Sequence, residues 1–262
     1  MVRRGLAPSR QQAQADIAAG RVTVAGAPAA KAARLVAPGE PIQVQGPPPR
    51  FVGRGGEKLA GALERFGLPV RGRRALDVGA STGGFSDCLL QHGATEVVAL
   101  DVGYGQLHER LRADPRVDVR ERTNIRHVRP GDLGPPFDVV VADLSFISLR
   151  TVLPSVLALA APQADLVLLV KPQFEAGRAE VSRGRGVVTD PATWRRVLRD
   201  VLGALGEGGA AIMGAMVSPL TGADGNVEFL VHATAGPASP TAAADVDALV
   251  EAAVLEAEPR LG

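Results

Sequence analysis

Four charged residues that lie far apart in the chain carry side chains able to activate a hydroxyl group. Lys171 and Asp143 each directly follow a run of apolar residues, as expected for side chains at the ends of buried strands. The ends of parallel strands are where sheets of this kind build active sites. Lys58 and Glu228 complete the set, with Lys58 early in the chain and Glu228 late.

Burial and a nearby like charge favour the neutral amine of a lysine, which can then take a proton from a weakly acidic hydroxyl. Carboxylates beside the same lysine favour its protonated form, so the residues alone leave open which group is the base. A solvated lysine at a strand end is the plain structural alternative.

A Gly-rich segment supplies a candidate cofactor site. The run ALDVGASTGGFSDCLL at 75–90 is an apolar strand, a Gly-rich turn and a helix, and a second strand ends at Asp101. Glycine permits a close approach of backbone to ligand, and an acid about twenty residues further on can accept hydrogen bonds from ribose hydroxyls. The dinucleotide pattern G-x-G-x-x-G is not met, which disfavours a redox enzyme. The predicted cofactor is S-adenosylmethionine, with these contacts: Asp77, Gly79, Ser81, Thr82, Gly83, Gly84, Phe85 and Asp101. A structural tight turn is the alternative.

The elements that must position these residues alternate between strand and helix. Apolar patterning predicts strands at 74–78, 96–100, 137–142 and 164–170, helices at 56–66, 84–92, 149–160, 191–205 and 242–257, and a late hairpin from 209–217 and 227–233. This order predicts an α/β, Rossmann-like, doubly wound and mostly parallel sheet with an antiparallel hairpin at its C-terminal end. It suits a methyltransferase architecture better than a dehydrogenase.

The first part of the chain is basic and differs in pattern. Residues 1–74 hold 13 of the 29 Lys and Arg residues but 4 of the 28 Asp and Glu residues. A helix at 9–19 and short strands at 21–24 and 41–44 resemble the small RNA-binding module named after ribosomal protein S4. The resemblance implies RNA contacts by Arg3, Arg4, Ser9, Arg10, Gln11 and Lys31. A merely solvated basic face is the alternative.

We therefore expect an α+β S4-like domain at 1–46, a Pro-rich linker at 47–54 and a catalytic domain at 55–262. The S4-like pattern is a helix–turn–helix-like pair followed by a strand hairpin. Related chains have more residues before the first Arg pair. Either this module is trimmed at its front or the true start lies upstream of Met1.

Four sequence segments carry a resemblance to a known family: GRGGEKL, ALDVGASTGGF, VADLSFISL and VKPQFE. Together with the order Lys-Asp-Lys-Glu, they resemble the FtsJ-type ribose 2′-O-methyltransferases. Within that type they resemble the TlyA family of bacterial rRNA methyltransferases, also called hemolysins. The resemblance implies methylation of a cytidine 2′-hydroxyl in small- or large-subunit ribosomal RNA, with Lys171 as general base and Lys58, Asp143 and Glu228 orienting the hydroxyl. Gly53 stands where related chains usually have Ser.

The long segment 173–190 is Gly-rich and basic. Its Arg178, Arg183 and Arg185 can grip phosphates near the target nucleotide, or the segment is a plain surface loop. Trp194 is expected to pack a helix on the sheet. The single Cys88 excludes an internal disulfide, and the four histidines have no ligand spacing, so no metal site is predicted.

The chain has no apolar run long enough to span a membrane and no signal-peptide core, which predicts a cytoplasmic protein. Two other functions stay open. One is an RNA-binding ribosome assembly factor with a vestigial cofactor fold, which the intact charged set disfavours. The other is a cytolysin, which the acidic character of the terminal helix disfavours.

Overall fold

The computed structural model describes residues 1–7, 10–46, 49–177, 181, 186–222, 224–236 and 245–261. The chain divides into two compact units, Met1–Arg54 and Gly55–Gly262. Each unit has its own core of buried apolar side chains.

The smaller unit is a short helix with a three-stranded sheet. Its elements are η1 (Val2–Arg4), α1 (Arg10–Ala18), β1 (Val22–Val24), β2 (Ala27–Pro28) and β3 (Ile42–Val44), and the strand order is β2-β1-β3. Ala25 and Gly26 both have positive φ, 52° and 81°, which makes the tight turn between β1 and β2. A single 3-10 turn, η1, precedes α1 at the place of the first helix in the S4-like pattern.

The larger unit is built on a seven-stranded sheet in the order β6-β5-β4-β7-β8-β10-β9. Its strands are β4 (Arg74–Val78), β5 (Glu96–Leu100), β6 (Val117–Arg120), β7 (Phe137–Ala142), β8 (Ala160–Val170), β9 (Ala211–Val217) and β10 (Phe229–Thr234). The first five strands in this order are parallel, and β10 runs antiparallel between β8 and β9. The predicted mostly parallel sheet with a late antiparallel hairpin is confirmed.

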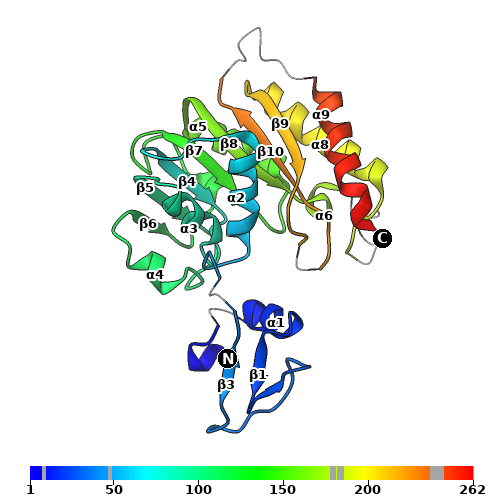
Figure 1. The fold of residues 1–262 in the computed structure, drawn as a ribbon. Helices are drawn as coiled ribbons and strands as arrows, with labels where there is room; N and C mark the ends of the chain where they lie inside the picture. Colours follow the sequence, from blue (N-terminus) through cyan, green and yellow to red (C-terminus); the bar gives the residue numbers. More distant parts are fainter. Residues whose placement is uncertain are drawn as a thin grey trace. The chain divides into compact units, whose positions relative to one another are not determined.

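Helices cover both faces of this sheet (Figure 1). They are α2 (Gly55–Phe66), α3 (Gly84–Gln91), α4 (Glu109–Arg112), α5 (Leu149–Leu159), α6 (Pro172–Glu175), α8 (Pro191–Glu207) and α9 (Val246–Ala257), with 3-10 turns η2 (Ile125–His127) and η3 (Glu258–Leu261). α2 packs with α3, while α5, α8 and α9 share one apolar cluster with the sheet. A strand covered by helices on both faces has a continuous run of apolar residues in its sequence. Residues 166–170 of β8 form such a run, and all five are almost completely buried.

The interpretation of Trp194 is confirmed. It is fully buried, packs edge-on against Phe229 with ring centroids 5.8 Å apart, and donates its indole N–H to the Val188 carbonyl at 2.9 Å. Four of the α-helices and strands were not expected from the sequence: β2 in the smaller unit, and α4, β6 and α6 in the larger unit. All four are short, and too few residues lie in each to show a hydrophobic period.

Candidate active site

The Gly-rich turn is locked against two neighbouring strands at the carboxyl edge of the sheet. The backbone N–H groups of Gly79 and Ala80 both donate to the Leu100 carbonyl, at 2.8 and 3.1 Å. Gly79 has φ of 87°, and a Cβ there would lie 2.6 Å from the Asp143 carbonyl oxygen. Only glycine therefore fits this position, and the ends of β4, β5 and β7 meet around it.

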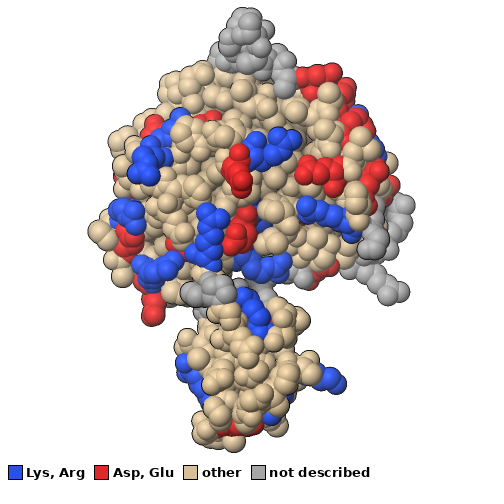
Figure 2. Space-filling model, viewed as in Figure 1, with Lys and Arg blue, Asp and Glu red and all other residues tan. Residues whose placement is uncertain are grey.

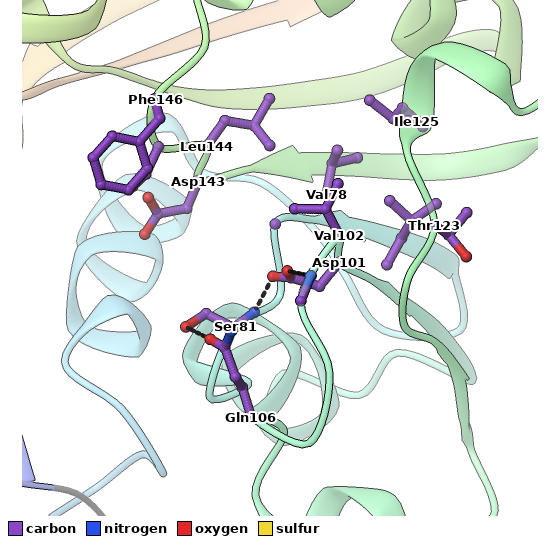
Figure 3. Close-up of a pocket in the computed structure, with 14 residues that line it drawn as sticks. Val78, Ser81, Asp101, Val102, Gln106, Thr123, Ile125, Asp143, Leu144 and Phe146 are labelled. Carbon is purple, nitrogen blue, oxygen red and sulfur yellow. Dashed lines mark hydrogen bonds between the residues drawn. The ribbon is translucent and has the colours of Figure 1, made fainter.

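Asp101 organises the next part of the turn (Figure 3). One of its carboxylate oxygens accepts the Ser81 N–H at 2.8 Å, and the other accepts the Gly103 N–H at 2.7 Å. Ser81 has φ of 49°, a conformation that a side chain rarely adopts. The carboxylate holds this strained turn in place and keeps further lone pairs for a ligand.

These residues surround a cavity of about 330 Å³ at the ends of β4, β5 and β7. Asp143 and Phe146 lie on one side of the cavity, and Thr123 and Ile125 lie on the other (Figure 3). The lining is largely apolar, with carboxylates at Asp101 and Asp143. This volume and mixture fit a small-molecule site with a few orienting polar groups.

Asp77 of β4 directly precedes the cavity-lining Val78 and is completely buried. Its Oδ2 accepts the Ser86 hydroxyl at 2.6 Å, while its Oδ1 has no hydrogen-bond partner among the residues that the structure describes. The pKa of this carboxyl is raised from 3.8 to about 7, mainly by burial and also by the nearby carboxylates of Asp143 and Asp101, while the hydrogen bonds from Ser86 lower it.

The four charged residues singled out in the sequence form two ion pairs. Lys58 Nζ, from α2, lies 2.5 Å from Glu228 Oε2, and Lys171 Nζ lies 2.6 Å from Asp143 Oδ1. Lys58, Lys171 and Glu228 are 7%, 9% and 2% exposed. Charges this far from water persist only when they are paired, so each lysine depends on its carboxylate.

Strand register brings the two pairs together. Phe229 of β10 lies opposite Val170 of β8 in an antiparallel ladder. The preceding Glu228 and the following Lys171 therefore occupy facing positions one step beyond the ladder. The structure thus gathers all four predicted side chains at one edge of the sheet, beside the cavity that Asp143 lines.

A short loop before β10 holds Glu228 in place. Gly222 donates its N–H to the Asn226 carbonyl at 2.8 Å, and a Cβ on Gly222 would lie 2.8 Å from Glu228 Oε1. The Asn226 side chain accepts the Val188 N–H and donates to the Gly186 carbonyl, both at 2.9 Å. Neither residue was singled out in the sequence, although the Gly and Asn types hint at a turn.

The tetrapeptide after Lys171 also has a structural explanation. Glu175 of α6 is buried and caps the start of α5: its Oε1 accepts the Leu149 N–H, and its Oε2 accepts the Ser148 hydroxyl, both at 2.6 Å. A carboxylate at a helix N-terminus satisfies otherwise unpaired N–H groups. It thereby ties the segment that carries Lys171 to the helix that follows Asp143.

Three residues beside Asp143 were missed from the sequence. Leu144, Ser145 and Phe146 all line the cavity, and Lys171 Nζ donates to Ser145 Oγ at 3.0 Å. Phe146 is 91% exposed and has φ of 66°. Gln106, Thr123 and Ile125 line the other side and were missed as well. Leu144, Ser145 and Phe146 lie in the segment VADLSFISL that the sequence resemblance singles out, whereas no local pattern marks Gln106, Thr123 and Ile125.

The structure places the remaining predicted residues as follows. Gly79, Ser81 and Asp101 line the cavity, whereas Thr82, Gly83, Gly84 and Phe85 belong to the turn and first helical turn behind it. A Cβ on Gly83 would lie 2.2 Å from Leu111 Cδ1, so this glycine serves close packing. Ser9, Arg178, Arg183, Arg185 and the side chain of Gln11 lie outside the described residues.

On the smaller unit, Arg3, Arg10 and Lys31 are exposed. Arg4 is also exposed, but its guanidinium donates to the carbonyls of Glu40, Ala37 and Pro38, at 2.6, 2.7 and 2.9 Å. Arg4 therefore holds the loop before β3 as well as adding positive charge.

Charges on the face of the larger unit drawn in Figure 2 are mixed, and acidic side chains gather over α9. Asp247 and Glu251 of α9 pair with Arg199 and Arg195 of α8 at 2.6 and 2.8 Å. Within the described part of the chain, no helix has both the length and the apolar character needed to cross a membrane.

Comparison with known families agrees with this geometry. Residues 51–235 match the sequence model of the FtsJ-like methyltransferases, and residues 1–42 match that of the S4 domain. The chain belongs to the FtsJ-like methyltransferase family. The family accounts for the Gly-rich turn and for the order of strands around the cavity.

Several relatives share nearly the whole chain. A Mycobacterium tuberculosis protein named 16S/23S rRNA (cytidine-2′-O)-methyltransferase TlyA is 52% identical over 232 residues, which are 88% of this chain and 86% of the relative. A Bacillus subtilis protein named putative rRNA methyltransferase YqxC is 45% identical over 240 residues, 88% of this chain and 83% of the relative. A solved structure described as a putative hemolysin from Streptococcus thermophilus has a TM-score of 0.79 and 36% identity, covering 96% of this chain and 92% of that one. The resemblance to TlyA is confirmed.

Proposed function

We propose that this protein transfers a methyl group from S-adenosylmethionine to the ribose 2′-hydroxyl of a cytidine in ribosomal RNA. One observation carries the proposal: Asp143 lines the cavity and also pairs with Lys171. Asp143 therefore connects Lys171, the proposed proton acceptor, to a cavity of the size of a nucleoside. The nucleotide and the class of RNA come from the name of the relative from M. tuberculosis.

The cavity residues fit this cofactor. The Asp101 carboxylate is placed to accept the two ribose hydroxyls, and the apolar side chains of Val102 and Ile125 suit a purine ring. Gly79 presents bare backbone, since a Cβ there has no room. When bound, the cofactor would supply a methyl group on a positively charged sulfur, and the Asp143 carboxylate lines the same cavity.

The four charged residues then act on the ribose hydroxyl that accepts the methyl group. Lys171 takes the proton of the 2′-hydroxyl on Nζ, and Asp143 holds that amine in place. Glu228 faces Lys171 and is itself paired with Lys58, so the second pair orients the ribose and sets the charge around the base. Alignment of the hydroxyl oxygen with the methyl carbon is the main source of rate enhancement in such displacements.

The smaller unit supplies affinity for the large substrate. Its match to the S4 model and the exposed Arg3, Arg10 and Lys31 support binding to an RNA backbone through counterion release. Ser9, Gln11, Arg178, Arg183 and Arg185 remain proposed RNA contacts, and Arg4 adds charge beside its structural role. A ribosomal RNA substrate places the enzyme in the cytoplasm.

The test is methylation of purified small subunits, large subunits and free ribosomal RNA with labelled S-adenosylmethionine, followed by mapping of the modified nucleotide. We expect 2′-O-methylcytidine in at least one RNA species. Lys171→Ala should abolish the label while retaining binding of cofactor and RNA, and Glu64→Gln, an exposed change on α2, should keep full activity. Absence of label in every species would favour the assembly-factor function, and full turnover by Lys171→Ala would refute its role as base.

A further inference from the structure

Ser145 touches the base but belongs to neither ion pair. Its Oγ lies 3.0 Å from Lys171 Nζ, while Asp143 Oδ1 lies 2.6 Å from the same nitrogen. Ser145 and Asp143 both line the cavity. The amine is thus held from two directions by residues that are two positions apart in one short turn.

The backbone of this turn is strained. Phe146 has φ of 66°, in the left-handed region that bulky side chains rarely occupy. Its side chain is 91% exposed, so burial of the ring does not offset the strain. Strain of this kind persists where the surrounding structure enforces it, and it gathers at functional sites. Here the strained residue directly follows Ser145, which contacts Lys171.

We propose that Ser145 is a positioning residue that, together with Asp143, aims the lone pair of the neutral Lys171 amine at the substrate hydroxyl. This inference rests on the proposed function. A neutral amine has two N–H groups and one lone pair. Asp143 Oδ1 and Ser145 Oγ accept one N–H each, which leaves the lone pair a single remaining direction around Nζ.

The proton balance of the step follows. The O–H bond of the ribose breaks and a third N–H bond forms on Lys171, while the oxygen gains the methyl group and the cofactor leaves as a neutral thioether. The ammonium then loses its proton to solvent. Without Ser145, one N–H has no acceptor, and rotation about the Cε–Nζ bond spreads the lone pair over several directions.

Ser145 is a neutral partner in a charged surrounding. Asp143 contacts Lys171, Glu228 occupies the facing position just before β10, and Lys58 is paired with Glu228. Removal of the Ser145 hydroxyl leaves these charges in place and takes away one of the two acceptors that fix the direction of Nζ.

The first test is steady-state kinetics of Ser145→Ala and Ser145→Thr on the RNA that the wild type methylates. We expect Ser145→Ala to lower kcat by about 10- to 100-fold, since small displacements of a reacting group cost up to about 100-fold. KM for RNA and the affinity for S-adenosylhomocysteine should change by less than about twofold, because the substitution removes no charge and, of the cavity lining, only one hydroxyl that is already engaged by Lys171. Ser145→Thr retains the hydroxyl and should recover most of kcat. Ser155→Ala on α5, outside the cavity, is the matched control.

The second test needs no methylation. The rate at which an amine-reactive reagent labels Lys171 in the free protein at one fixed pH, measured by mass spectrometry, reports how firmly the amine is held. Labelling should be faster in Ser145→Ala and return to the wild-type rate in Ser145→Thr. Unchanged kcat in Ser145→Ala, or a loss of kcat without a change in labelling rate and without rescue by Thr, would overturn the inference. An inactive wild type would refute the proposed function instead, and the labelling result would still decide the role of Ser145.

Discussion

Asp77 makes a pH-dependent contribution to stability whose sign can be worked out from its surroundings. Burial raises the pKa of this carboxyl from 3.8 to about 7 in the folded protein. The folded state therefore holds the proton more tightly than the unfolded state does. As pH rises from about 4 to about 7, the unfolded chain ionises first, and the free energy of unfolding falls. A shift of about three units corresponds to about 4 kcal/mol when complete.

Asp77→Asn removes this titration and keeps the size of the side chain. The variant resembles the protonated wild type, so the difference in unfolding free energy between variant and wild type should grow with pH. Between about pH 5 and about pH 8 we expect it to grow by about 2 to 3 kcal/mol in favour of the variant, because part of the total is already lost below pH 5. Urea denaturation followed by circular dichroism at each pH measures the difference.

The exposed Glu64→Gln substitution on α2 is the control, and its difference from wild type should be the same at both pH values. A direct measurement is the carboxyl carbon signal of Asp77 in a labelled sample, which should titrate near neutral pH. A stability difference that does not change with pH would refute the reasoning. It would mean that the buried carboxyl titrates as it does in water.

Three further predictions concern the same edge of the sheet. Gly79→Ala should lower the free energy of unfolding by at least about 2 kcal/mol, because backbone strain adds to a steric clash, and it should weaken cofactor binding measured by calorimetry. The control is Gly67→Ala, which has a similar φ but open space around it and should therefore show the effect of backbone strain alone. Glu228→Gln should destabilise the protein by about 3 to 5 kcal/mol in urea denaturation, because it leaves the charge of Lys58 buried without its partner. The double variant that also carries Lys58→Met should recover most of the lost free energy of unfolding. Phe146→Gly should relieve positive φ and raise unfolding free energy by about 1 kcal/mol, and an equal or lower value would show that the ring stabilises the turn.

The parts of the site that follow from local pattern were predictable. The strand before Gly79, the turn, the following helix and the distance to Asp101 lie within one strand–helix–strand unit, where apolar runs and glycines mark each boundary. The ends of buried strands also marked Lys171 and Asp143, since parallel strands finish at one edge of the sheet.

The remaining features depend on contacts that no local pattern encodes. Lys58 and Glu228 are 170 positions apart, and only the β10 ladder decides that they meet. Phe146 adopts a conformation that its residue type disfavours, so the conformation of this turn was not predicted, although it lies in the segment VADLSFISL that carries the family resemblance. Glu175 looks like a surface residue in the sequence, yet it is buried as the cap of another helix. Tertiary structure overrides local preference at each of these positions.

The position of β10 has a consequence for how the protein is made. Every residue that lines the cavity precedes residue 147, whereas Glu228 directly precedes β10, a strand that inserts between two others near the end of the chain. During synthesis, the cofactor half emerges from the ribosome well before the acid that pairs with Lys58. All residues that line the cavity are thus translated before Glu228, and the ion pair between Lys58 and Glu228 can form only after the segment that leads into β10 has been made.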